Sequence, residues 1–228
     1  MKKLKFRLYN GLRKFFRKNK TVRNVVDRQG SFFTKVVNID NNHCCVGAMF
    51  QVKGSAELIF GDNAQGSSVV IGDNVELKNI KINIKGSGCK VFIADNVRFS
   101  GHILVVGKNR QVTIGENTTA VGVYILARER DVYIGQDCML SREIEIRATD
   151  VHKIYEMNGN KRLNPPADVV IGNKVWVGAR AFISKGVSIP DGCIIGACSF
   201  VNKKFVERNC IIAGNPARVV KQDIRWER

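Results

Sequence analysis

Apolar residues recur with a period of six in the C-terminal half of the chain. From Ile171 to Val201 every sixth residue is aliphatic, and the fifth position of each hexad is small or β-branched. An α-helix would repeat near 3.6 residues, so a six-residue period does not fit a helical face. It fits a short strand followed by a tight turn. The aliphatic positions are Ile171, Val177, Ile183, Ile189, Ile195 and Val201.

A longer period of about twenty residues contains this one. Tetrads of the type Ile-Gly-x-Asn start at successive isoleucines, and the steps between them are 22, 21, 20 and 37 residues. Three hexads and a few extra residues make one three-sided coil, which can bury its aliphatic residues only by stacking on other coils. Strand-type hydrogen bonds would then join coils ~4.8 Å apart. We therefore predict an all-β parallel solenoid, with a less regular register before residue 70. The tetrads start at Ile71, Ile93, Ile114, Ile134 and Ile171.

The 37-residue step indicates an insertion of about 19 residues, at 149–168. A solenoid has no packing need for such a loop, and long loops on rigid scaffolds often carry function. This one contains His152, one of three histidines, and soon after it comes Trp176, one of two tryptophans.

Positive charge is concentrated at the N-terminus. The 228 residues carry a net charge of +17, and residues 1–24 hold ten basic side chains and no acidic one. Leucines and phenylalanines recur there at helical spacing, which predicts a basic amphipathic helix. It could pack on the main domain, bind an anionic membrane surface or attract an acidic polymer.

Composition excludes several classes of protein. No apolar stretch approaches the ~18 residues of a membrane-spanning helix, and no apolar region precedes a cleavage site, so we expect a cytoplasmic protein. Seven cysteines without framework spacing fit reduced thiols. The adjacent Cys44 and Cys45 lack the spacing of a tetrahedral metal site, so we expect no metal. The basic residues form no known nucleic-acid module, so we expect no nucleic-acid partner.

Several motifs together resemble the hexapeptide-repeat acetyltransferases. They are most similar to the sugar O-acetyltransferases of capsule, sialic-acid polymer and O-antigen modification. The resemblance implies a left-handed parallel β-helix over 36–217, after a basic N-terminal segment at 1–35 and before a C-terminal tail at 218–228. The motifs are Asp150-x-His152, Asn164, Ile171-Gly172-x-x-Val175-Trp176-Val177-Gly178, Gly196-Ala197 and Ala213-Gly214-Asn215-Pro216-Ala217-Arg218.

The resemblance also implies a reaction and an assembly. The donor would be acetyl-CoA, the acceptor a sugar hydroxyl of a surface polysaccharide or its precursor, and the active sites would lie between subunits of a homotrimer. His152 matches the catalytic histidine, which takes the proton of the attacking hydroxyl. Asp150 is a candidate to orient it, with Glu156 as a rival. Trp176 and the backbone of Gly178 or Ala179 are candidates to stabilise the oxyanion.

By the same resemblance, a further set of positions falls where the family contacts coenzyme A. Arg and Lys among them could pair with its phosphates. Two alternatives stay open at this point: N- or O-acetylation of a small molecule such as a nucleotide-sugar amine, serine or an antibiotic, and a non-catalytic binding solenoid. The coenzyme positions are Gly178, Ala179, Ala197, Asn202, Lys203, Arg218 and Lys221.

Overall fold

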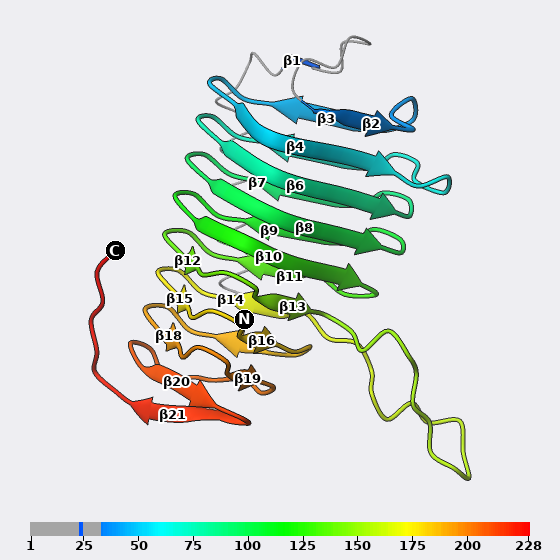
Figure 1. Cartoon of the computed structure of the whole chain (residues 1–228). Helices are drawn as coiled ribbons and strands as arrows, with labels where there is room; N and C mark the ends of the chain where they lie inside the picture. The colour runs from blue at the N-terminus through cyan, green and yellow to red at the C-terminus, as the bar shows by residue number, and fades with distance from the viewer. Residues whose placement is uncertain (1–22, 25–32) are drawn as a thin grey trace.

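The computed structural model describes residues 23–24 and 33–228, and its regular elements over this part of the chain are all β-strands (Figure 1). The chain winds into a stack of coils, and two sheets run along the stack. The eight strands of the first sheet are β1 (Arg23–Asn24), β3 (His43–Val46), β5 (Ser68–Ile71), β7 (Lys90–Ile93), β9 (Gln111–Ile114), β11 (Val132–Ile134), β14 (Val169–Ile171) and β17 (Ser188–Ile189).

The second sheet covers the other two sides of the stack. Its thirteen strands are β2 (Lys35–Val37), β4 (Gln51–Phe60), β6 (Glu76–Lys85), β8 (Arg98–Val106), β10 (Thr119–Arg128), β12 (Met139–Leu140), β13 (Glu145–Arg147), β15 (Trp176–Val177), β16 (Phe182–Ile183), β18 (Ile194–Ile195), β19 (Phe200–Val201), β20 (Ile211–Gly214) and β21 (Ala217–Lys221).

Each coil has three sides and three corners. The first corner follows a strand of the first sheet, as at 72–75 and 172–175. The second corner divides the two sides of the second sheet, as at 178–181, and the third leads back to the first sheet, as at 184–187. In the N-terminal coils the second corner is a bulge inside one long strand. In β10 it lies between Ala120 and Val123, and the two halves of β10 pair separately with β12 and β13.

The tetrad isoleucines form a continuous inner column. Parallel pairing places each of them beside the next, and all are at most 1% exposed. Fully burying one such side chain stabilises the fold by about 1.5–3 kcal/mol. The predicted stack of coils around an aliphatic interior is therefore confirmed. The tetrad isoleucines in the column are Ile71, Ile93, Ile114, Ile134 and Ile171, and Ile189 of β17 continues it.

The polar residues of the tetrads form a second column, at the first corner. Asn74, Asn96 and Asn117 each have positive φ, a conformation that Asn tolerates better than most residues. Each side-chain amide donates to the next coil: Asn74 to Asn96 at 2.9 Å, Asn96 to Asn117 at 3.1 Å, and Asn117 to Asp137 at 3.0 Å. This ladder joins four coils outside the apolar core.

Antiparallel pairing occurs at both ends of the stack. β1 pairs with β3, and β21 pairs with β20. At Arg23 and Asn24, the chain is therefore strand rather than helix. The predicted amphipathic helix otherwise lies outside the described residues. Among the residues that are described, no helix could cross a membrane.

Candidate active site

The insertion is an arm that leaves the third corner between β13 and β14 (Figure 1). Its base is closed by the Ala167 N–H, which donates to Ala148 O at 3.1 Å. Further out, the Leu163 N–H donates to Ile154 O at 2.8 Å, and Tyr155 forms an antiparallel bridge with Arg162. The arm is therefore a hydrogen-bonded hairpin rather than an open loop.

Asn164 holds the two strands of the arm around His152. Its side chain is only 8% exposed and accepts a hydrogen bond from the Ile154 N–H at 2.8 Å. Its amide donates to His152 O at 2.8 Å and to Asp150 Oδ2 at 2.9 Å. The His152 N–H donates to Asp150 O at 2.8 Å. The backbone of His152 is thus held on both sides, while its side chain is exposed.

Val151, directly before His152, has a φ of 69°. A β-branched residue is a genuine outlier at positive φ, because its side chain crowds the backbone there. Such strain persists only where the surroundings enforce it, and it is common at functional sites. Val151 is surrounded by such bonds. Its own N–H donates to Thr149 Oγ1 at 3.1 Å, and Asn164 bonds to the residues on either side of it, Asp150 and His152.

The Asp150 carboxylate forms an ion pair with Lys185, which extends from the third corner of the following coil. Partial burial alone would raise the pKa of Asp150, but hydrogen bonds from Lys185 and Asn164 lower it below its usual value. In the single chain, therefore, Asp150 anchors the base of the arm, and its carboxylate is engaged by Lys185 and Asn164. Sequence reasoning gave Lys185 no role, since only the stacking of coils brings it to the arm.

A second ion pair attaches the arm further along. Arg162 Nη1 lies 2.8 Å from Glu129 Oε2 on the third corner of an earlier coil. Hydrogen bonding from Arg162 lowers the pKa of Glu129. The arm is thus attached to the coils on both sides of it.

Trp176 begins β15, between the first and second corners, and its indole is half-buried. Its Nε1–H donates to Ser141 Oγ at 3.4 Å, and its ring packs on Trp226 with centroids 6.2 Å apart. The arm that carries His152 leaves the solenoid on the opposite side from β15 (Figure 1). One chain therefore does not bring His152 and Trp176 together.

Three of the proposed coenzyme positions stack at the second corner. Gly178 donates its N–H to Ile195 O at 2.8 Å, and the Ala179 carbonyl accepts from Cys198 N at 2.9 Å. A Cβ at Gly178 would lie 2.6 Å from the Ala197 nitrogen, so close stacking of coils requires glycine there. Ala197 is exposed on the next coil. The Gly178 N–H is already hydrogen-bonded within the solenoid. The Ala179 N–H is therefore the remaining backbone candidate to donate to the oxyanion.

The other coenzyme positions are spread over two places. Asn202 and Lys203 follow β19 at the third corner, and both are exposed. Arg218 and Lys221 are exposed on β21, where Arg218 pairs with Ala213 below the second corner. The second corner and the last strand thus present one continuous edge, and Lys203 lies on the same corner as the arm.

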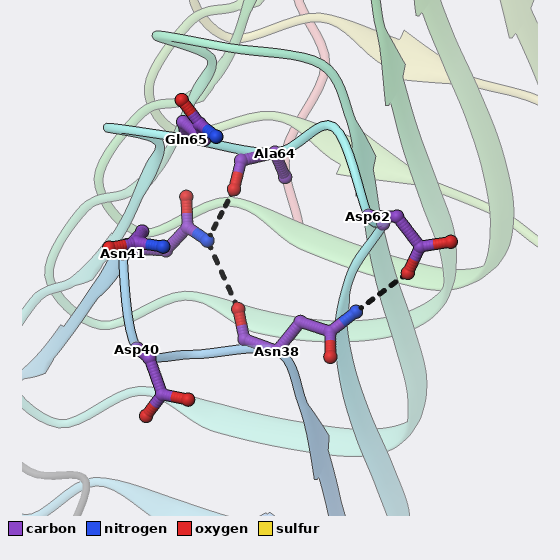
Figure 2. A pocket seen from close by; sticks show the side chains of 8 residues that line it. Asn38, Asp40, Asn41, Asp62, Ala64 and Gln65 are labelled. Atoms are coloured by element: carbon purple, nitrogen blue, oxygen red, sulfur yellow. Dashed lines mark hydrogen bonds between the residues drawn. The ribbon is translucent and has the colours of Figure 1, made fainter.

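A polar pocket of about 250 Å³ lies at the N-terminal end of the stack (Figure 2). The Asn42 amide donates to Ala64 O at 2.7 Å, and Asn38 donates to Asp62 at 3.1 Å. The charged residues that line the pocket are two carboxylates, Asp40 and Asp62, which would repel the phosphates of a coenzyme. It is also many coils away from the arm. Its lining residues are Asn38, Asp40, Asn41, Asn42, Gly61, Asp62, Ala64 and Gln65.

Other polar groups offer no alternative centre in the part of the chain that is described. There, no three His, Cys, Asp or Glu side chains are grouped to hold a metal. All seven cysteines are free thiols. His102 packs on Tyr124 with ring centroids 5.3 Å apart, and burial together with nearby lysines lowers its pKa.

Comparison with known proteins identifies the family. Residues 168–203 match the bacterial transferase hexapeptide (six repeats) model. A polysialic acid O-acetyltransferase of Neisseria meningitidis is 39% identical over 171 residues, which cover 75% of this chain and 78% of that protein. A polysialic acid O-acetyltransferase of Escherichia coli O1:K1 is 37% identical over 60% of this chain and 45% of its own length.

Solved structures agree with these matches. The polySia-specific acetyltransferase NeuO superimposes with a TM-score of 0.74 and 32% identity, covering 86% of this chain and 89% of its own. The polysialic acid O-acetyltransferase OatWY gives a TM-score of 0.70 and 34% identity, covering 85% and 88%. The predicted left-handed parallel β-helix is confirmed, and a non-catalytic solenoid is not supported. The chain therefore belongs to the hexapeptide-repeat acetyltransferases, the family that includes the polysialic acid O-acetyltransferases.

Proposed function

We propose that this protein transfers the acetyl group of acetyl-CoA to a hydroxyl of polysialic acid, with His152 as the general base. The names of its relatives support the acetyl transfer and the sialic-acid polymer. The net charge of +17 favours a polyanionic acceptor, because a basic surface attracts and concentrates it. The observation that carries the proposal is the backbone of His152, which directly follows the strained Val151 and is held on both sides, on an arm that the solenoid does not need for its own packing.

His152 would supply the base that an alcohol needs near neutral pH. One imidazole nitrogen takes the hydroxyl proton while the oxygen attacks the thioester carbonyl carbon. The carbonyl oxygen becomes an oxyanion. When the tetrahedral intermediate collapses, the carbon–sulfur bond breaks and the coenzyme thiolate takes the proton from the imidazolium. The acetyl ester forms without a covalent enzyme intermediate.

Trp176 and the Ala179 N–H are the candidates to stabilise the oxyanion. The long 3.4 Å bond from the Trp176 indole to Ser141 leaves that N–H weakly engaged. Arg218, Lys203 and Lys221 suit the coenzyme phosphates, because exposed guanidinium and ammonium groups pair with phosphate.

We infer that the active site forms between two subunits of a homotrimer. The separation of His152 and Trp176 in one chain supports this, because only a neighbouring copy could bring them together. Apolar side chains along the arm are exposed, among them Met157 at 97% and Ile154 at 55%. Large exposed apolar residues gathered on one projecting element favour contact with another chain.

Two further predictions stay untested. One is that residues 1–24 contact an anionic membrane, and the other is that the protein is cytoplasmic. Vesicle binding by the full chain, compared with a chain that lacks residues 1–24, tests the first.

The test of function is acetyl transfer measured as release of free coenzyme thiol, with oligosialic acid as the acceptor. His152→Ala should reduce kcat by roughly 10²–10⁴-fold, the usual contribution of a general base. Asn158→Ala, an exposed change in the same arm, is the matched control and should keep wild-type turnover. Unchanged turnover in His152→Ala would refute the assignment. Release with a small amine but not with oligosialic acid would refute the acceptor.

A further inference from the structure

After β21 the chain turns back and runs along the first corner toward earlier coils. We call residues 222–228 the returning segment (Figure 1). The turn is made at Asp223, whose φ is 56°. The Ile224 N–H then donates to Asn209 O at 2.9 Å.

Alternate residues of the returning segment face the solenoid, as expected for an extended chain. Trp226 is 8% exposed and donates its indole N–H to Lys174 O at 3.0 Å. The Arg228 guanidinium donates to Cys138 O at 2.7 Å and to Asn117 O at 3.1 Å. On either side of Trp226, Arg225 and Glu227 form an exposed ion pair with each other at 3.1 Å. The segment is thus docked over several coils by Trp226 and Arg228.

This docking brings the two tryptophans of the chain together. The rings of Trp226 and Trp176 have centroids 6.2 Å apart and planes inclined at 48°, within the range of favourable aromatic pairs. The indole N–H of Trp176 has its long bond to Ser141, and the in-register neighbours of Trp176 on the adjacent coils are Met139 and Ile194. A half-buried indole with one weak hydrogen bond needs a packing partner to keep one orientation.

We propose that Trp226 is a positioning residue for acetyl transfer, which fixes the orientation of the Trp176 indole. The inference rests on the proposed function, in which Trp176 faces the reacting carbonyl. Catalytic geometry is sensitive to displacements of about 1 Å, so a loosened indole would slow the chemical step more than it would weaken substrate binding.

The test compares Trp226→Ala with Trp226→Phe. Phenylalanine keeps an aromatic ring against Trp176, whereas alanine removes it. Because the chain has two tryptophans, either variant leaves Trp176 as the only emitting indole. Glu227→Ala, an exposed change in the same segment, is the control for general disturbance of the segment.

We expect the Trp176 emission to be red-shifted and more easily quenched by acrylamide in Trp226→Ala than in Trp226→Phe. We also expect kcat to fall about tenfold in Trp226→Ala with little change in KM, and to be largely retained in Trp226→Phe. Glu227→Ala should keep the kcat of the wild-type protein. Provided that the wild-type protein is active, either of two results overturns the inference. The first is a Trp226→Ala variant with the kcat of the wild-type protein. The second is a Trp226→Ala variant with the same Trp176 emission as Trp226→Phe. If the wild-type protein itself releases no coenzyme thiol, the proposed function has failed instead.

Discussion

At the scale of single residues, several polar contacts of the arm hold the backbone of His152 and of the residues next to it. Asn164 bonds to both strands of the arm, and Lys185 fixes the carboxylate of Asp150. The strained φ of Val151 is possible because these bonds surround it. Pre-organisation of this kind lets a general base act without first being ordered by the substrate.

Asn164→Ala tests this role. The substitution leaves the Ile154 N–H and the His152 carbonyl without their partner, which should destabilise the arm locally by about 1–3 kcal/mol. We expect faster amide hydrogen exchange in residues 150–164 and a lower kcat, with the melting temperature of the solenoid nearly unchanged. Asn158→Ala is again the control. Exchange in the arm that matches the wild-type rate would show that Asn164 does not order it.

At the scale of elements, the first corner combines conformation and hydrogen bonding in the same residues. The ladder of Asn74, Asn96, Asn117 and Asp137 satisfies side-chain amides while the backbone of each residue adopts positive φ. Because Lys174 stands at the corresponding position of a later coil, the ladder ends before it. The Lys174 carbonyl instead accepts from Trp226.

Substitution of Asn96 separates the contribution of the ladder hydrogen bonds to stability from the contribution of the positive φ. Asn96→Gly keeps access to positive φ but loses two ladder bonds, whereas Asn96→Ala loses the bonds and adds backbone strain. We expect unfolding free energies lowered by roughly 1–2 kcal/mol in Asn96→Gly and by about 1 kcal/mol more in Asn96→Ala. Denaturant titration measures both. Equal unfolding free energies for the alanine and glycine variants would show that the positive φ adds no backbone strain in the alanine variant.

The fold could be predicted where each hexad forms its own short strand and turn. From β14 to β19 strands of two or three residues alternate with tight turns, so the period of six is visible in the sequence. In the coils before β11 the period of six is obscured, because strands such as β4 and β10 run ten residues and turn the second corner through a bulge. A bulge shifts the alternation of side chains, which hides the repeat.

The site could be predicted only in part, for a related reason. His152 and Trp176 stand in recognisable motifs, but their supports come from other coils. Lys185 contacts a residue 35 positions away, and Trp226 contacts a carbonyl 52 positions away. Such contacts depend on the number of residues in each coil and on the path of the returning segment. The local sequence pattern gives neither the number of residues in each coil nor the path of the returning segment.

At the scale of the whole molecule, the solenoid separates the parts of its proposed active site. It holds His152 on an arm at the third corner and Trp176 on β15, on the opposite side of the following coil. A cyclic assembly can join these two parts, since each copy offers its arm to one neighbour and its β15 face to the other. A site shared between neighbouring copies is therefore a requirement of the proposed mechanism, which the proposed homotrimer would meet.

Complementation between inactive variants tests this claim most directly. His152→Ala and Trp176→Ala, each with a different affinity tag, are co-expressed, mixed oligomers are purified through both tags, and coenzyme thiol release with oligosialic acid is measured. In a trimer that contains both variants, one of the three interfaces pairs an intact His152 with an intact Trp176 of the neighbour, so roughly a third of wild-type activity should return. Activity no higher than that of the separate variants would contradict a site shared between two subunits.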